Sequence, residues 1–465
     1  MKSLKIAVLA CMIISASMLS GCVEDSSLPT PTSGSDAYAT LVAQALGTPT
    51  AASAPKTPIV QTPITSFNAM TYQIKLAPSV QKPAPNTAYM DPQFGTRVTR
   101  ISDARSQKLA GVMPEYSRRQ AWNANESLML LHSGDGSSLL YDGVTYQYKK
   151  VLSAVNGQDV FWHPTDPAII FFNPENALYS YNVNTGEQKK LYTFADYKFV
   201  GTRAEGGLSR DGRWYAFVGQ VLDPSTQEYP FRDLGVFDMT TNQIAAKLAL
   251  PKNLQSLDWI SISPLGNFVV VDYADTVAER FHGVEVYDRN FKLLWQKPLG
   301  AGHSDLAIDA DGSEVLIMDV YDPQKNVTQI KKYWLADRNK ETVLLEVSSL
   351  FDLHISCQNQ EQAGVCFIST FDYVDRLAHD PRTWLTFEDE VFSLKLDGSG
   401  EVQRIAHHHS RRFSPTTPDS DNSVYWAEPH ATVSRNGDRV LFGSNWEQDV
   451  EQEAGVDAYV VDLRK

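Results

Sequence analysis

The sequence predicts an all-β protein made of repeated small sheets, and two observations lead to that prediction. Beyond residue 66, short runs rich in Val, Ile, Phe, Tyr and Leu alternate with turn residues, and amphipathic helical periodicity is rare. The turns also recur as similar corners with a period of roughly 40–55 residues, which indicates a repeat architecture.

Each repeat is expected to hold four antiparallel strands. Corners such as Ser209–Gly212, Ser263–Gly266 and Ser434–Gly437 are each followed by an apolar run, for example "RWYAFVGQ" or "NFVVVDY". A third run ends in a second turn ("VEVYDRN"), and a fourth often carries Lys or Leu ("FKLLWQKPL"). Four such strands at this period are typical of one blade of a β-propeller.

Counting the repeats predicts a seven-bladed β-propeller. The last repeat ends before its outer strand, whereas the segment Gly95–Ala104 ("GTRVTRISDA") supplies a spare strand ahead of the first repeat. We therefore expect this N-terminal strand to complete blade seven and close the ring, which removes an open sheet edge. The predicted blades begin near Tyr116, Asp159, Glu205, Leu257, His303, His354 and Tyr425.

The N-terminal region has the pattern of a secreted lipoprotein. A short basic start and the apolar run Ile6–Met18, which is too short to span a bilayer comfortably, predict a signal peptide over residues 1–21. The sequence Leu19-Ser-Gly-Cys22 resembles a bacterial lipobox, so Cys22 is the expected lipidation site, and Val23 after it favours the outer membrane of a Gram-negative bacterium. Residues 22–66 are rich in Ser, Thr, Pro, Ala and Gly and predict a flexible tether, which leaves residues 67–465 for the propeller.

The charge balance limits the partners. The 465 residues carry a net charge of -14, and a general nucleic-acid binder needs a basic surface instead. An anionic ligand still fits if arginines gather locally, since Arg pairs with carboxylate or sulfate in a bidentate manner. We expect a monomer that binds an anionic polysaccharide and is attached to the membrane through Cys22.

Propeller geometry predicts one face where polar residues meet. The innermost strand of each blade begins at this face, and the loop between the second and third strands opens on it. Histidines, arginines and aromatic residues occur at these places in several repeats, and aromatic rings stack on sugars. The predicted substrate-binding residues are Arg119, Gln120, Arg203, His303, His430 and Trp446.

Four segments carry a resemblance to seven-bladed propeller polysaccharide lyases, namely the oligogalacturonate lyases and the propeller ulvan lyases. They are "YSRRQAWNANESLMLL", "GHSDLAIDADGSEVLI", "HISCQN…GVCFIST" and "EPHATVSRNGDRVLFGSNW", and the likeness extends over about residues 95–465. The last segment also resembles the TolB-type repeat. The alternative to a lyase is therefore a surface-anchored propeller lipoprotein, glycan-binding or TolB-like, without catalytic activity.

The resemblance implies cleavage of a uronate polymer by β-elimination. A base removes the C5 proton, an acid protonates the leaving oxygen at C4, and a cation neutralises the carboxylate. Ulvan lyases use a His/Tyr pair with an Arg, which implies His132 as the base, Tyr273 as the acid and Arg280 as the neutralising cation. Oligogalacturonate lyases use a metal held by His and Gln, and a clear Gln-x-x-His-x-His motif is lacking, so the sequence favours an ulvan-like substrate.

Two cysteines in the predicted propeller leave two alternatives open. Cys357 and Cys366 lie on adjacent predicted strands, and a disulfide between them suits an exported protein. The other alternative is a structural zinc ion bound by His354, Cys357, Cys366 and one histidine of the run 407–409, taken as His408. Residues three apart on a regular strand point to opposite faces, which argues against zinc, whereas the structural zinc of propeller ulvan lyases argues for it.

Overall fold

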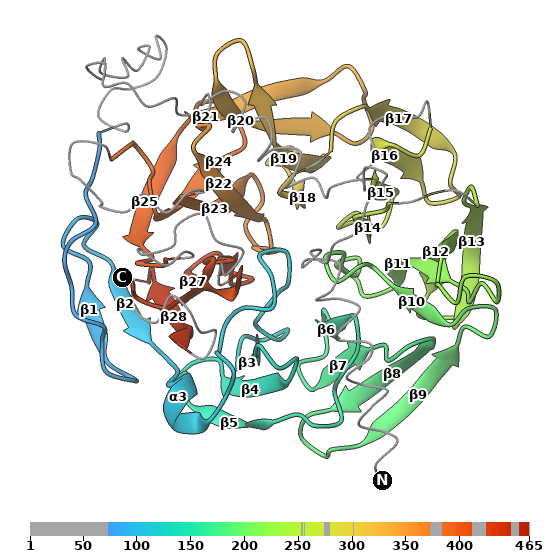
Figure 1. Cartoon of the computed structure of the whole chain (residues 1–465), viewed down its shortest axis with the longest axis horizontal. Helices are drawn as coiled ribbons and strands as arrows, with labels where there is room; N and C mark the ends of the chain where they lie inside the picture. The colour runs from blue at the N-terminus through green and yellow to red at the C-terminus, as the bar shows by residue number, and fades with distance from the viewer. Residues whose placement is uncertain are drawn as a thin grey trace, which may run out of the picture.

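Seven antiparallel sheets are arranged as blades around a central axis, which confirms the predicted seven-bladed β-propeller (Figure 1). The computed structural model describes residues 73–252, 254, 256–273, 280–300, 302–372, 384–411, 425–447 and 455–464. Within these ranges there is no helix long and apolar enough to cross a bilayer. The predicted signal peptide (1–21) and tether (22–66) lie outside the described residues.

Blades two to six each contain four strands that follow one another from the axis to the rim (Figure 1). In all five blades the pairing of the third and fourth strands shifts by one residue, and such β-bulges increase the twist of a sheet. The strands are β6 (Val160–Trp162), β7 (Ile169–Phe172), β8 (Ala177–Asn182) and β9 (Gln188–Thr193) in blade two; β10 (Phe199–Gly201), β11 (Trp214–Gln220), β12 (Phe231–Asp238) and β13 (Gln243–Ala249) in blade three; β14 (Trp259–Ile262), β15 (Phe268–Tyr273), β16 (Gly283–Asp288) and β17 (Leu293–Lys297) in blade four; β18 (Ser304–Ile308), β19 (Glu314–Asp322), β20 (Val327–Trp334) and β21 (Glu341–Ser348) in blade five; and β22 (Phe351–Ser356), β23 (Val365–Asp372), β24 (Glu390–Lys395) and β25 (Val402–His407) in blade six.

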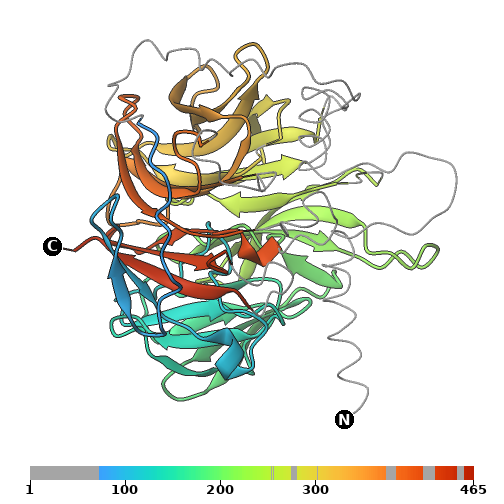
Figure 2. The same ribbon diagram turned by 60° about the vertical axis from the view of Figure 1, so that its left-hand side comes forward.

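Blade seven is closed by the N-terminal strand, as the sequence predicts. Its sheet consists of β26 (Thr432–Val433), β27 (Arg439–Ser444) and β28 (Asp457–Asp462), with β2 (Arg97–Arg100) paired antiparallel to β28. Figure 2 shows the blue N-terminal strands beside the red C-terminal ones. A further strand, β1 (Ala88–Met90), extends the same sheet beyond β2.

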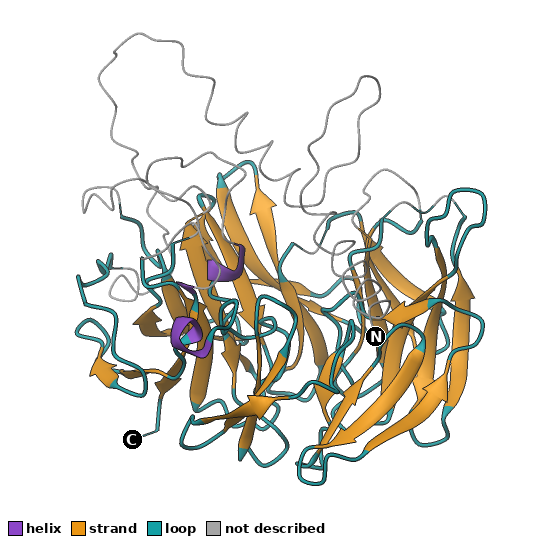
Figure 3. Ribbon diagram, turned by 60° about the horizontal axis from the view of Figure 1, so that its bottom comes forward, coloured by secondary structure: helices purple, strands orange, loops and turns teal. Residues whose placement is uncertain are grey.

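Blade one differs from the prediction at its innermost position. Its sheet contains β3 (Leu128–His132), β4 (Ser138–Asp142) and β5 (Tyr148–Val151), and the segment before β3 contributes only two isolated bridges, Met113 to His132 and Trp122 to Met129. The residues near Tyr116 form a turn instead, in which the Arg119 N–H donates to the Tyr116 carbonyl at 3.0 Å. The described residues also contain two short helical turns, α3 (Ala104–Gln107) and the 3-10 turn η1 (Tyr425–Ala427) (Figure 3).

The repeated Ser-x-x-Gly corners have a local physical cause. The hydroxyl oxygen of Ser209 accepts a hydrogen bond from the Trp214 N–H at 2.9 Å, and Ser263 accepts in the same way from the Phe268 N–H at 2.9 Å. Gly212 ends its corner with a φ of +73°, a conformation that glycine adopts without steric cost. Each corner thereby turns the chain tightly from the first strand of a blade into the second.

The hydrophobic core lies between neighbouring blades. Between blades four and five, for example, Trp259, Val270 and Val284 pack against Leu306 and Leu316, and all of them are buried. Burial of each such side chain stabilises the fold by about 1.5–3 kcal/mol relative to exposure. Because every blade needs the faces of both neighbours, the ring positions its inner strands together around the axis.

Candidate functional site

Side chains from blades one, five, six and seven meet at one mouth of the ring. We call this group the mouth cluster; it consists of Tyr116, His132, His303, Asp352, His354, Tyr425, Trp426, Glu428 and His430. The ring contacts within it are continuous, because His303 lies 4.5 Å from His354, His354 lies 4.2 Å from His430, and Trp426 links His430 to His132 at 6.0 and 5.2 Å. These distances join ring centroids. The prediction that polar residues gather on this face is therefore met for His132, His303 and His430.

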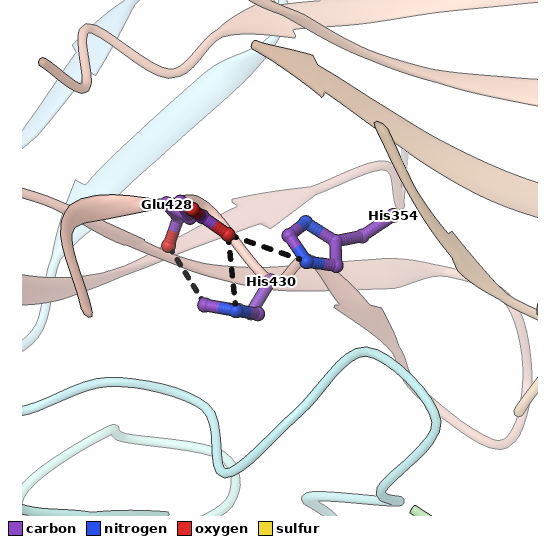
Figure 4. A group of neighbouring side chains, drawn as sticks. All are labelled: His354, Glu428 and His430. Carbon is purple, nitrogen blue, oxygen red and sulfur yellow. Dashed lines mark hydrogen bonds and ion pairs between the residues drawn. The ribbon is translucent and has the colours of Figure 1, made fainter. Parts of the chain in front are cut away.

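The centre of the mouth cluster is a buried group of two histidines and one glutamate (Figure 4). Glu428 Oε2 lies 3.6 Å from the Nε2 atoms of both His354 and His430, and the potential ligand atoms of the three residues all lie within 4.8 Å of one another. His430 Nδ1 lies 3.0 Å from the Glu428 carbonyl oxygen, which only accepts, so Nδ1 carries the proton. In the neutral ring, Nε2 then presents its lone pair toward Glu428, which is the arrangement of a metal-binding histidine.

These three residues fit a divalent metal ion by the chemistry of their donors, since imidazole nitrogens and a carboxylate suit Zn²⁺ and Mn²⁺. The backbone at His430 has a φ of +41°, which a residue with a Cβ rarely adopts. Strained backbone of this kind is concentrated at functional sites. His354, Glu428 and His430 thus form a possible metal site.

His303 lies directly before β18 and is held by carboxylates. Its Nδ1 lies 2.9 Å from Asp352 Oδ1, and its backbone N–H donates to Asp319 Oδ1 at 2.7 Å. Burial by itself lowers the pKa of His303, but the carboxylates of Asp352, Asp319 and Glu428 raise it to about 9. Burial also raises the pKa of Asp319 to about 7, against the opposing effect of His303. His303 is therefore an imidazolium at neutral pH.

Arg118 lies at the edge of the mouth cluster, next to Tyr116. Its guanidinium pairs with Glu205, and its central carbon lies 4.3 Å from the ring centroid of Trp259 and 5.9 Å from that of Tyr116. Burial, together with the Glu205 carboxylate, raises the pKa of the Tyr116 phenol well above its usual value. Tyr116 is therefore a protonated hydrogen-bond donor at neutral pH.

His132 lies at the end of β3, as its predicted role requires. Desolvation lowers its pKa to about 4, although Asp135 acts in the opposite direction. The ring is thus neutral at pH 7, the form in which an imidazole can accept a proton.

Tyr273 and Arg280 do not join the mouth cluster through any contact seen in the described residues. Tyr273 is fully buried, and its hydroxyl lies 3.3 Å from that of Tyr287. Arg280 Nε donates to Glu285 Oε1 at 3.1 Å, and the Tyr287 hydroxyl also bonds to Glu285. The predicted acid and the predicted cation are thus engaged in a network within blade four, because their partners lie on the adjacent strand β16.

The predicted substrate-binding arginines and Trp446 have other partners. Arg119 is buried and bonds to Asp159 Oδ1 at 2.6 Å and to the Ala204 carbonyl at 3.0 Å, which ties blade one to blades two and three. Arg203 follows β10 in a left-handed turn (φ +65°), with its guanidinium 5.7 Å from the Phe231 ring. Blade three accordingly begins at β10, ahead of the predicted start at Glu205.

Trp446 and Gln120 are likewise engaged with protein groups. Trp446 is only 3% exposed, and its Nε1 donates to the Val80 carbonyl at 2.9 Å, so it supports the N-terminal segment and offers no face to a sugar. Gln120 Nε2 donates to the carbonyls of Gln358 and Val433, at 2.8 and 3.2 Å.

Of the two alternatives for Cys357 and Cys366, the structure contains the disulfide. Cys357 and Cys366 are bonded to each other, with a Cα–Cα distance of 4.5 Å. His408 lies elsewhere, with Nε2 2.7 Å from the Thr370 carbonyl and Nδ1 accepting from the Ser410 N–H at 3.0 Å. The zinc set His354, Cys357, Cys366 and His408 is therefore not formed, because the sulfurs bond to each other and His354 faces Glu428.

Sequence reasoning missed Asp352, Tyr425 and Trp426 as site residues. Asp352 could have been found, since it lies two residues before His354 on one strand and so shares its face. Tyr425 and Trp426 belong to a 3-10 turn rather than to a strand, and no periodicity marks them. Glu428 lies two residues before the predicted His430, but its pairing with His354 depends on how blades six and seven meet.

The fold resembles that of a solved structure. A crystal structure of oligogalacturonate lyase from Vibrio parahaemolyticus has a TM-score of 0.56 at 15% sequence identity, over 82% of this chain and 97% of that chain. The WD40 domain of Pan2 from Neurospora crassa has a TM-score of 0.47 at 10% identity, over 79% of this chain and 96% of that chain. No protein-family model and no curated protein matches the sequence. The chain is thus similar in fold to this oligogalacturonate lyase.

Proposed function

We propose that the protein is a polysaccharide lyase that cleaves a uronate-containing anionic polysaccharide by β-elimination at the mouth cluster. One observation carries the proposal: His354, Glu428 and His430 form a buried ligand group beside the protonated His303. The similarity of the fold to an oligogalacturonate lyase supports the reaction class.

The charge at the mouth explains why a metal ion is part of the proposal. Asp352 and Glu428 belong to the cluster, and Glu205 and Asp319 lie beside it with pKa values that burial raises to about 7, whereas the nearby cations are Arg118 and His303. This balance leaves little net positive charge to attract a uronate polymer. A divalent cation held by His354, Glu428 and His430 supplies the positive charge that neutralises the substrate carboxylate and acidifies the C5 proton.

Residues of this chain can carry the proton transfers. The neutral His132 is retained as the base, and Tyr116 replaces Tyr273 as the proton donor to the leaving oxygen, since its ring lies in the mouth cluster, 5.3 Å from that of His430. His303 is placed to donate a hydrogen bond to the carboxylate, and Trp426, half-buried beside His430, has a ring that can stack on a sugar. Arg280 is given no role because Glu285 already neutralises it.

The proposed substrate class includes the ulvan-like polymer favoured by the sequence, and a substrate panel tests it. The full-length protein is incubated with ulvan, polygalacturonate, alginate and a neutral glucan, with and without Mn²⁺, and absorbance near 235 nm (roughly) reports unsaturated ends. Elimination on at least one uronate polymer, reduced about a hundredfold or more by His132→Ala, is expected. Absence of product on every polymer contradicts the proposal.

A second candidate function is a glycan-binding propeller without catalysis. It is favoured by the burial of His354 and His430, both 0% exposed, which leaves His303 and the aromatic residues as the accessible part of the cluster. Affinity electrophoresis with the same polymers distinguishes the two functions, because binding without an unsaturated product supports this alternative.

The location follows from the N-terminal pattern and is also a proposal. We infer that Cys22 is acylated and anchors a monomer to the outer membrane, where an anionic polysaccharide is its partner. Membrane fractionation of the wild type and of Cys22→Ser tests this, and an unchanged membrane fraction in the variant contradicts it.

A further inference from the structure

Blade three carries the hairpin between β11 and β12 on the mouth face. Its innermost strand β10 begins at Phe199, just as His303 directly precedes the innermost strand of blade five. Phe199 pairs with Gln220, the last residue of β11, so the hairpin that follows Gln220 lies at the same edge of the blade.

Arg203 lies in a fixed turn directly after β10. Arg203 and Ala204 both have left-handed backbone conformations, with φ of +65° and +66°, which residues with a Cβ rarely adopt. The turn is held on both sides, because the Thr202 N–H donates to Asp159 Oδ2 at 2.8 Å and the Ala204 carbonyl accepts from Arg119 Nε at 3.0 Å. Strained backbone of this kind is concentrated at functional sites.

Arg203 differs from other arginines of blades one and four, because no carboxylate pairs with it among the described residues. Those arginines are held in the ion pairs Arg118–Glu205, Arg119–Asp159 and Arg280–Glu285. The guanidinium of Arg203, which is half-buried, instead lies 5.7 Å from the Phe231 ring. Of its nitrogen atoms only Nε is buried without a hydrogen-bond partner, so the two Nη atoms are left for a ligand.

Three half-buried aromatic rings lie at the same edge as Arg203. Phe199 and Phe231 both pair with Gln220 and therefore lie on one face of the sheet, and the Tyr229 ring lies 4.8 Å from that of Phe199. Gln220 Nε2 donates to the Tyr229 carbonyl at 2.8 Å, which holds the hairpin against β11. We call Phe199, Arg203, Tyr229 and Phe231 the blade-three shelf.

The composition of the blade-three shelf indicates the ligand. Sites for small molecules combine aromatic lining with a few polar groups that fix orientation. A guanidinium without a carboxylate partner suits a carboxylate or sulfate group, which it binds in a bidentate manner. A ligand with an anionic group and a face that packs against aromatic rings is an anionic sugar.

We propose that the blade-three shelf is a subsite for an anionic sugar that flanks the sugar bound at the mouth cluster. The two sites are close, because Glu205, two residues after Arg203, pairs with Arg118 beside Tyr116 of the mouth cluster. Arg203 pairs with the carboxylate or sulfate of the flanking sugar, and the Tyr229 ring packs against its face. The inference rests on the proposed function, since both sites take the same polymer, but binding at the shelf is measured without turnover.

Affinity electrophoresis of the full-length protein tests the subsite, in the presence of a chelator and 0.15 M salt. The gels contain polygalacturonate, which carries only carboxylates, dextran sulfate, which carries only sulfates, or neutral dextran. We expect at least one anionic polymer to retard the protein and neutral dextran to have no effect. Arg203→Gln should raise the dissociation constant for that polymer about tenfold, and Tyr229→Ala about threefold.

Two matched controls separate the subsite from general effects. Arg232→Gln also removes one positive charge from blade three, but Arg232 is exposed and its Nε lies 3.6 Å from Asp233 Oδ2. Tyr148→Ala removes an exposed tyrosine from the outer strand of blade one. Both variants should bind as the wild type does.

The outcome for each polymer identifies the anionic group, and other outcomes overturn the subsite. Retardation by neither anionic polymer, equal retardation by neutral dextran, an unchanged constant in Arg203→Gln, or an equal loss in Arg232→Gln contradicts it. If Arg203→Gln fails to fold, Arg203→Lys replaces it, because the variant keeps the charge and should lose bidentate binding by a few-fold.

Failure of the subsite and failure of the proposed lyase give different results. An unsaturated product together with unchanged binding in Arg203→Gln removes the subsite and leaves the lyase. Weakened binding in Arg203→Gln without product on any uronate polymer supports the shelf and contradicts the lyase.

Discussion

The mouth cluster and the blade-four network lie at the same kind of place in the propeller but are built differently. The network of Tyr273, Arg280, Glu285 and Tyr287 comes from two adjacent strands and the loop between them. The mouth cluster draws His132, His303, His354 and His430 from four different blades. Polar groups that find partners within their own blade stabilise that blade, whereas groups brought together by ring closure remain arranged around the axis, where His303 stays partly exposed to a ligand.

The largest effect should come from the centre of the mouth cluster. We expect His430→Ala to lower the elimination rate by about a hundredfold or more, because it removes one of the three ligand groups, which are His354, Glu428 and His430. The substitution also removes a fully buried ring, so the unfolding temperature in metal-free buffer is measured beside the rate. Rates within a few-fold of the wild type would show that catalysis occurs elsewhere.

Metal removal should have the next largest effect. Dialysis against a chelator is expected to reduce activity at least tenfold, and adding Mn²⁺ or Zn²⁺ should raise the unfolding temperature of the wild type, since a ligand bound only by the folded state stabilises it. The metal-induced rise in unfolding temperature is a second readout beside activity. It should vanish in the His354→Ala variant. A metal-dependent shift of equal size in that variant would contradict the assigned ligands.

Titration of His303 should have an effect of intermediate size on activity and stability. Its pKa of about 9 lies above the ordinary value of 6.5, so its stabilising interaction with Asp352, Asp319 and Glu428 is complete below about pH 6.5 and is lost as the pH rises through 9. Activity and unfolding temperature of the wild type should therefore both fall between about pH 8 and 10.

His303→Gln tests that assignment, because glutamine retains hydrogen-bonding capacity without titrating. The variant should be less active at pH 7 and should lack the alkaline decline in activity and stability. If the alkaline decline persists unchanged in His303→Gln, a group other than His303 causes it.

The smallest effect on activity is expected in blade four. Tyr273→Phe removes the hydroxyl 3.3 Å from Tyr287 and should lower stability by about 1 kcal/mol while leaving elimination within about twofold of the wild type. Denaturant unfolding and the rate at saturating substrate measure the two quantities. A large loss of activity with unchanged stability would indicate that Tyr273 is the acid. The blade-four network would then be part of the catalytic site, as the mouth cluster is proposed to be.

Much of the fold was predictable because its signals are local. The Ser-x-x-Gly corners, the alternation of apolar runs and the spare strand at 95–104 led to seven blades and to the closure by β2. The exceptions are also informative. The segment near Tyr116 forms a turn where a strand was predicted, and Arg119 is buried against Asp159, because contacts with other blades override the local pattern there.

The sequence by itself determined that polar residues would collect at one face, since strand direction in each blade follows from the order of strands and corners. It did not determine which of them meet. His354 and Glu428 lie 74 positions apart and His303 and His354 lie 51 apart, and their contacts depend on how blades five, six and seven pack around the axis. The same holds for the disulfide, which the spacing of Cys357 and Cys366 permitted and the strand pairing of β22 and β23 brought about. Local chemistry set the architecture, whereas burial between blades selected the partners, because the apolar faces fix the relative positions of the strands that carry these side chains.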